Sequence, residues 1–258
     1  MTIKFGPGGL GSVKEAVGNL KKYHELGLRA CEIEFTYGIY IKGEDTGEIK
    51  KAAEKNDIDL SIHAQYWINL NSKEKQKIED SKKRILKCCE IGEMLGAKVV
   101  VFHAGFYGKD DRELVYQNIK KAVLEMMKEI KRKKWKIKIA AETMGKVNVF
   151  GSADEILRLV EETGCELCVD FAHLVARENG QTSYEKIYKR FQDCKKLHCH
   201  FSGIEFGEKG EKKHILTPEY EWKKLLTAVN DKKDITIINE SPDTVGDSVK
   251  GLEIYNNL

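Results

Sequence analysis

The chain has 258 residues, and 41% of them are hydrophobic, which is enough to bury a sizeable core in one large α/β domain or two small ones. Its 44 basic and 41 acidic side chains nearly cancel, so the formal net charge of +3 excludes a strongly cationic surface by count alone. A local groove of Lys and Arg needs only a few of these residues, so nucleic acid remains a candidate partner. With no run of about 20 apolar residues, we expect no membrane contact.

Seven cysteines stand at irregular positions with no secretory signal before them, so we expect reduced thiols and a cytoplasmic protein. Cys165 and Cys168 form a lone CxxC pair. A structural zinc site requires a second pair or two suitably spaced histidines. We therefore interpret these two cysteines as core positions of a strand.

Short runs rich in β-branched or aromatic residues recur along the chain, and each is followed by a polar turn and a longer helical pattern. In chain order the runs are TIKFG, ACEIEF, IDLSIH, KVVVFH, KIKIAAE, CELCVD, KLHCHF and ITIINE. Clear helical patterns cover residues 12–26, 72–95, 112–131 and 221–229. Apolar strands that alternate with helices indicate a parallel α/β sheet, and eight such units predict a single (β/α)8 TIM barrel over residues 1–258.

Polar side chains close six of these predicted strands. They are His63, His103, Glu142, Asp170, His200 and Glu240. Because the carboxyl ends of barrel strands converge on the face that carries active sites, we expect all six in one pocket. His173 follows Asp170 by three residues, so the loop above the barrel can return it to the same pocket.

Three carboxylates in one buried pocket repel one another unless cations compensate, and no Lys or Arg ends any of these six strands. Bound divalent metal is the simplest compensation. Mixed imidazole and carboxylate ligands favour zinc, manganese or iron over calcium, and there are enough ligands for more than one ion. A single strand-end histidine such as His63 is more often a satisfied core residue, so the prediction depends on the joint pattern. Two ions about 3.5–4 Å apart, bridged by a carboxylate, suit phosphoester cleavage.

The motifs SIHAQYWINL, VVVFHAG, IAAETMGK, CVDFAH, HCHFSG followed by KKH, and IINESP stand in the order found in endonuclease IV. From about the second strand to the last, the sequence resembles these zinc-dependent apurinic/apyrimidinic endonucleases, which are xylose-isomerase-like TIM barrels. The resemblance implies hydrolysis of the phosphodiester 5′ to an abasic site in duplex DNA, with Tyr66 contacting DNA at the lesion. It also implies three metal ions. The first would be held by His63, His103 and Glu142, and the second by Glu142, Asp170, His200 and Glu240. The third would be held by His173, His214 and one more carboxylate.

The sequence departs from the endonuclease IV pattern in three places. Lys212 stands where the family has the Asp that accompanies the residue matching His214, and Glu211 is the nearest carboxylate. His200 is not followed by the usual Asn and Asp, and His198 offers a rival alignment or a supporting role in the barrel interior. The loop TYGIYIKGEDTGE after the second strand does not clearly reproduce the family's DNA-penetrating loop.

Two other function classes remain open. Glu142, Asp170, His200 and Glu240 alone would form the single-metal site of a sugar isomerase or epimerase, in which two glutamates shuttle a proton. A metal- or nucleic-acid-binding barrel without turnover would show salt-sensitive binding to any duplex. We predict the endonuclease, a monomer holding two to three zinc ions, with manganese as the alternative metal and Glu142 as the catalytic bridge.

Overall fold

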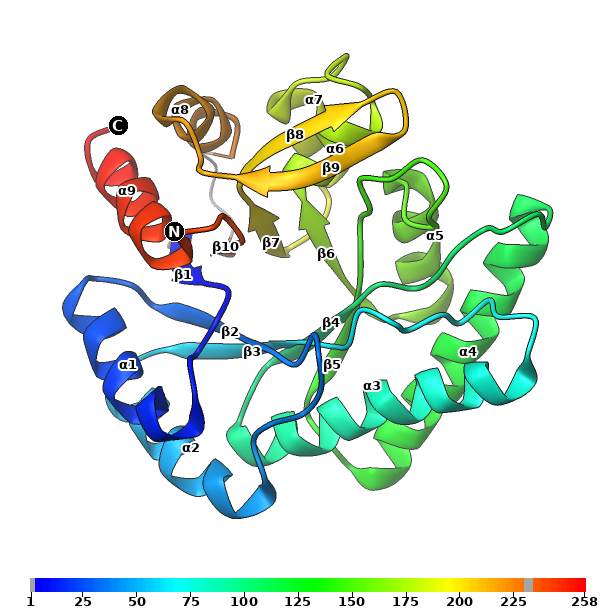
Figure 1. Cartoon of the computed structure of the whole chain (residues 1–258), viewed down its shortest axis with the longest axis horizontal. Coiled ribbons are helices and arrows are strands. Elements are labelled where there is room, and N and C mark those ends of the chain that lie inside the picture. The colour runs from blue at the N-terminus through cyan, green and yellow to red at the C-terminus, as the bar shows by residue number, and fades with distance from the viewer. Residues whose placement is uncertain (1–2, 230–233) are drawn as a thin grey trace.

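The computed structural model describes residues 3–229 and 234–258 (Figure 1). Eight parallel strands pair in the order β1-β10-β7-β6-β5-β4-β3-β2 and curl into a barrel. The strands are β1 (Ile3–Pro7), β2 (Ala30–Glu34), β3 (Asp59–His63), β4 (Val99–Phe102), β5 (Lys138–Glu142), β6 (Glu166–Asp170), β7 (Lys196–Phe201) and β10 (Asp234–Asn239). The predicted (β/α)8 TIM barrel is confirmed; Thr2, the first residue of the first predicted run, lies outside the described residues.

Helices cover the outside of the barrel (Figure 1). They are α1 (Val13–Glu25), α2 (Thr46–Lys55), preceded by the 3-10 turn η1 (Gly43–Asp45), α3 (Lys75–Leu95), α4 (Arg112–Lys133), α5 (Ala153–Thr163), α6 (Phe171–Arg177), α7 (Tyr184–Arg190), α8 (Glu219–Ala228) and α9 (Thr244–Asn256). Their amphipathic faces pack on the strands to form the main core. Among the described residues, no helix is both long and apolar enough to cross a membrane.

The barrel closes between β1 and β2, where the ladder is reduced to a bridge between Gly8 and Glu32. The amide of Gly9 donates to the carbonyl of Glu32 over 2.8 Å. A Cβ atom at Gly6 would lie 1.9 Å from the carbonyl oxygen of Ala30, so only glycine lets the two strands approach this closely.

Alternate residues of each strand face the barrel interior, because side chains alternate with a period of two. On β4, β5 and β6 the lower interior positions are small or apolar and form a separate buried cluster of Val99, Val101, Ala140 and Cys168. Cys165 and Cys168 are both buried, as predicted, but only Cys168 lies on the strand, since β6 begins one residue after Cys165. The next interior position upward on β5 is Glu142, and on β6 it is Asp170. The same alternation that fills the barrel therefore places the carboxylates at its upper end.

The sequence did not predict an antiparallel hairpin of β8 (Gly203–Gly207) and β9 (Gly210–Ile215) directly after β7. It lies over one side of the barrel and packs against α6 (Figure 1). Its turn uses Gly210 at a φ of 88°, and a bulge between Glu205 and Phe206 shifts the register of the two strands. This hairpin carries Glu211 and His214.

Candidate metal centre

The first cluster joins the ends of three neighbouring strands. Nε2 of His63, on β3, lies 3.2 Å from Oε2 of Glu142, and Nε2 of His103, directly after β4, lies 2.9 Å from the same oxygen. Nδ1 of His63 donates to the carbonyl of Ala64 over 2.7 Å, which turns Nε2 toward the cluster. Burial opposes a charge on His63, but Glu142 and Glu34 outweigh it and raise the pKa of this imidazole to about 10. A metal ion entering here would therefore displace a proton.

The second cluster contains Glu142, Asp170, His200 and Glu240, whose ligand atoms all lie within 4.8 Å of one another. Nδ1 of His200 lies 3.4 Å from Oε1 of Glu142 and 3.2 Å from Oε1 of Glu240. Among the described residues, Oε1 of Glu142, Oδ2 of Asp170 and Nδ1 of His200 are buried and lack a hydrogen-bond partner. Buried polar atoms are normally satisfied, so three orphaned ligand atoms that converge on one point fit a bound cation.

The third cluster is His173, Glu211 and His214. Nδ1 of His173 donates to the carbonyl of Thr143 over 3.0 Å, which leaves Nε2 facing Oε2 of Glu211 at 3.5 Å. The rings of His173 and His214 meet edge to face with centroids 5.2 Å apart. The structure thus brings Glu211 to the two histidines, and Lys212 is not part of this cluster.

Local structure brings His173 and Glu211 together beside one glycine. Asp170 caps α6 by accepting the amide N–H of His173 over 2.7 Å, so the residue that ends β6 also fixes the first turn of the helix. A Cβ atom at Gly145 would lie 2.7 Å from Cβ of Glu211 and 3.1 Å from Cδ2 of His173. Glycine at this position leaves room for the two side chains to face each other.

A cavity of about 330 Å³ lies above the three clusters, and seven of the side chains named in the sequence analysis line it. They are His63, Tyr66, His103, His173, Glu211, His214 and Glu240. Glu142, Asp170 and His200 lie beneath it and are buried. All eight predicted ligands are thus gathered at the upper end of the barrel.

Aromatic side chains surround the mouth of this cavity. Tyr66 is 48% exposed and stacks against His103 with centroids 5.7 Å apart, while Tyr37, which is 84% exposed, meets Tyr66 edge to face. Phe106 and the exposed Lys146 also line the cavity. Of these residues, only Tyr66 was predicted from the sequence, because the others lie in loops without a periodic pattern.

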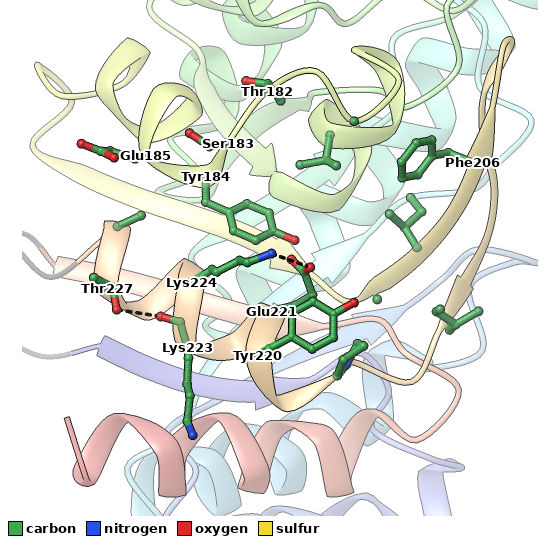
Figure 2. Close-up of a pocket in the computed structure, with 17 residues that line it drawn as sticks. Thr182, Ser183, Tyr184, Glu185, Phe206, Tyr220, Glu221, Lys223, Lys224 and Thr227 are labelled. Atoms are coloured by element: carbon green, nitrogen blue, oxygen red, sulfur yellow. Dashed lines mark hydrogen bonds and ion pairs between the residues drawn. The ribbon is translucent and has the colours of Figure 1, made fainter.

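A larger cavity of about 1010 Å³ lies between the hairpin, α7 and α8 (Figure 2). Tyr184 and Glu221 point toward each other across it, and Nζ of Lys224 pairs with Glu221 at 3.3 Å. None of the predicted site residues lines it. We therefore place the candidate chemistry in the smaller cavity.

Comparison with known proteins agrees with this architecture. Residues 20–257 match the family model described as xylose isomerase-like TIM barrel. The chain is 35% identical over 257 residues to an uncharacterized protein of Methanocaldococcus jannaschii, covering 95% of this chain and 92% of that protein.

Two solved structures share the fold. One is endonuclease IV from Thermus thermophilus, with a TM-score of 0.74, 17% identity and 98% of each chain covered. The other is a D-tagatose 3-epimerase-like protein, with a TM-score of 0.70, 19% identity and 99% of each chain covered. At these levels of sequence identity, structural similarity shows a shared fold and does not show a shared function. Since the family model spans nearly the whole barrel, the chain belongs to the xylose isomerase-like TIM barrel family.

Proposed function

We propose that the protein is a metal-dependent phosphodiester hydrolase that incises duplex DNA on the 5′ side of abasic sites. The observation that carries the proposal is the position of Glu142, whose Oε2 faces the first cluster and whose Oε1 faces the second. A carboxylate shared in this way suits the closely spaced ion pair of two-metal phosphoester chemistry. We propose two to three zinc ions, with manganese as the alternative.

The chain's own residues would hold and orient these ions. The Nδ1 donors of His63 and His173 each bond to a backbone carbonyl, which fixes the ring orientation and leaves Nε2 as the ligand atom. Divalent ions held in this way supply Lewis acidity and neutralise charge on the non-bridging phosphate oxygens. Glu142, whose two oxygens point in different directions, would set the separation between the first two sites.

The mouth of the cavity suits a distorted DNA strand. Tyr66 and Tyr37 present aromatic faces on which an unstacked base or sugar can lie, and an abasic nucleotide is the least costly nucleotide to extrude from a duplex. Lys146 adds a positive charge beside the clusters, where a phosphate would enter. These groups support Tyr66 as a DNA contact.

The direct test is incubation of the metal-replete protein with a duplex that carries one abasic-site analogue, beside an undamaged duplex and a chelator-treated sample. Incision 5′ to the lesion only, abolished by the chelator, is the expected result. Cleavage that persists without metal, or equal cutting of the undamaged duplex, would overturn the proposal.

A sugar isomerase or epimerase is the second candidate, and one observation favours it. Glu142 and Glu240 both face Nδ1 of His200, as two proton-shuttling carboxylates beside one ion would. This alternative leaves His63, His103 and the third cluster without a metal role, as substrate contacts or structural groups. A protein that binds metal but does not incise the lesion duplex, and that interconverts ketoses, would establish it.

A further inference from the structure

We propose that Glu32 is a positioning residue that sets the orientation of His200 in the metal centre, and that His198 holds Glu32 in place. The inference rests on the metal-binding part of the proposed function and is independent of the substrate. Neither Glu32 nor His198 belongs to the three clusters described above.

Glu32 lies on β2, and the two histidines lie on β7, which is not a neighbour of β2 in the sheet. The Glu32 side chain is fully buried and crosses the barrel interior. Its Oε1 lies 2.8 Å from Nε2 of His200, and its Oε2 accepts a hydrogen bond of 2.9 Å from Nε2 of His198. One carboxylate therefore contacts two imidazoles that stand two residues apart on the same strand.

The opposite edge of the His200 ring faces the candidate ligands. Nδ1 lies between Glu142 and Glu240, while Nε2 points down to Glu32. Among the described residues, Nε2 of His200 and Oε1 of Glu32 are buried atoms without a hydrogen-bond partner, so their 2.8 Å approach is a close ion-pair contact. The ring thus spans the interior, with Glu32 at one nitrogen and the second cluster at the other.

An imidazole that binds a metal through one nitrogen carries its proton on the other nitrogen. A carboxylate that accepts this proton fixes the tautomer, holds the ring plane and makes the ligand nitrogen more basic. At 2.8 Å from Nε2 of His200, Oε1 of Glu32 is close enough for this role. The bond from His198 to Oε2 restricts rotation of the carboxylate, so that Oε1 stays directed at His200.

The burial of Glu32 also requires an explanation. A carboxylate inside a barrel is costly unless it is paired, and strand interiors usually carry branched apolar side chains. Elsewhere the barrel interior is formed by small or apolar side chains, such as Val99 and Val101 on β4 and Ala140 on β5. A charge retained in this apolar surrounding, and held by two imidazoles, is consistent with a function in the metal centre.

The test measures metal binding. Glu32→Gln keeps the size and shape of the side chain and removes its charge. Competition with a chromophoric chelator measures the zinc affinity, and elemental analysis gives the number of bound ions. The visible spectrum of the cobalt-substituted protein reports the ligand field of the metal. We expect the number of bound ions to stay unchanged. The zinc affinity of the second cluster, which contains His200, should fall about 10- to 100-fold, and the visible absorption bands of the cobalt-substituted protein should shift.

Three further variants complete the design. His198→Gln is expected to lower the affinity in the same direction by a smaller factor, and it serves as the test if Glu32→Gln does not fold. Val99→Ala, at a lower position of the same interior, is the control and should change neither affinity nor ion count. Cys168→Ser tests whether the thiol beside His200 is itself a ligand. Circular dichroism of each metal-free variant verifies the fold.

Three outcomes would overturn the inference. Unchanged affinity and cobalt spectrum in folded Glu32→Gln would show that Glu32 has no positioning role. Loss of one whole ion in Cys168→Ser would show instead that Cys168, His198 and His200, whose ligand atoms lie within 4.8 Å of one another, hold an ion themselves. A wild-type protein that binds no metal would refute the metal centre and the inference together, whereas a failure to incise DNA would refute only the proposed function.

Discussion

In the candidate metal centre, Oε2 of Glu142 lies 2.9 Å from Nε2 of His103. The other oxygen of the same carboxylate lies 3.4 Å from Nδ1 of His200, on the far side of the barrel mouth. The first two clusters are therefore built around one side chain, and removing its charge affects both at once.

Glu142→Gln should lower the number of bound ions by one or two per chain and reduce incision of the lesion duplex at least about 100-fold, because a neutral amide is a poor bridge between two cations. The secondary structure should remain that of the wild type. Elemental analysis, circular dichroism and a single-turnover cleavage assay measure the three effects. Glu166→Gln, at the exposed lower end of β6, is the control, and near-wild-type turnover in Glu142→Gln would exclude the bridging role.

The metal-replete protein should contain two to three zinc or manganese ions per chain. Because the ions would bind the folded chain and not the unfolded one, chelation should lower the Tm, and added metal should restore it. Differential scanning calorimetry with and without a chelator measures this shift. A fully active protein without metal is the result that would contradict the prediction.

Glu211→Ala should remove about one ion per chain, because it leaves His173 and His214 without a carboxylate. Lys212→Ala, which changes the adjacent residue on the same hairpin strand, should retain every ion. Elemental analysis of the two variants, prepared identically, provides the comparison. Equal ion counts in both would mean that Glu211 is not a ligand.

Gly6→Ala should destabilise the protein by about 3 kcal/mol or more, because the new Cβ would lie 1.9 Å from the Ala30 carbonyl at the closing strand pair. Gly18→Ala is the matched control. It lies in α1 with no atom within 4 Å of the new Cβ, and it should stabilise by about 0.5–1 kcal/mol. Denaturant unfolding of both variants measures the difference, which should have opposite signs at the two glycines.

Asp59 contributes an acid-sensitive stabilisation at the start of β3. Burial opposes its charge, but Nζ of Lys4 at 2.7 Å and Nζ of Lys98 at 2.9 Å outweigh it and hold the pKa of this carboxyl below its usual value. Since the folded-state pKa is the lower one, the stabilisation is present above the unfolded-state pKa and is lost as the pH falls through the folded-state value.

Asp59→Asn should therefore lower the free energy of unfolding by about 1 kcal/mol at pH 7, and the difference should shrink as the pH falls below about 4. Urea unfolding of both proteins at pH 7 and pH 3 measures the two differences. A difference of the same size at both values would show that the charge of Asp59 does not contribute.

Much of the fold was accessible from the sequence because the barrel repeats one unit. Each strand combines a β-branched run with a polar residue at its end, and the length and spacing of the runs left few alternatives to a closed barrel. Among the barrel strands, the differences from the prediction lie at the ends. β4 ends at Phe102 and β10 at Asn239, so His103 and Glu240 each lie one residue beyond the strand.

Two parts of the site depend on contacts that a linear pattern does not encode. The hairpin strands are rich in Lys, Glu and Gly, because much of their surface is exposed, and they lack the apolar alternation of a buried strand. The role of Glu32 arises from β7, more than 160 residues away along the chain, through a contact across the barrel interior. The sequence signal was a pair of carboxylates, Glu32 and Glu34, inside the apolar run ACEIEF.

The hairpin of β8 and β9 allows the number of candidate metal ligands to change without a change in the barrel. β7 ends at Phe201 and β8 begins at Gly203, so the hairpin is inserted between one barrel strand and the helix that follows it. Glu211 and His214 are carried by this insertion, whereas the other seven predicted ligands stand at the ends of barrel strands or, like His173, in the first turn of α6. Replacing the hairpin would therefore alter the number of ions while leaving the barrel's ladder intact. Metal content and barrel stability could thus change independently of each other.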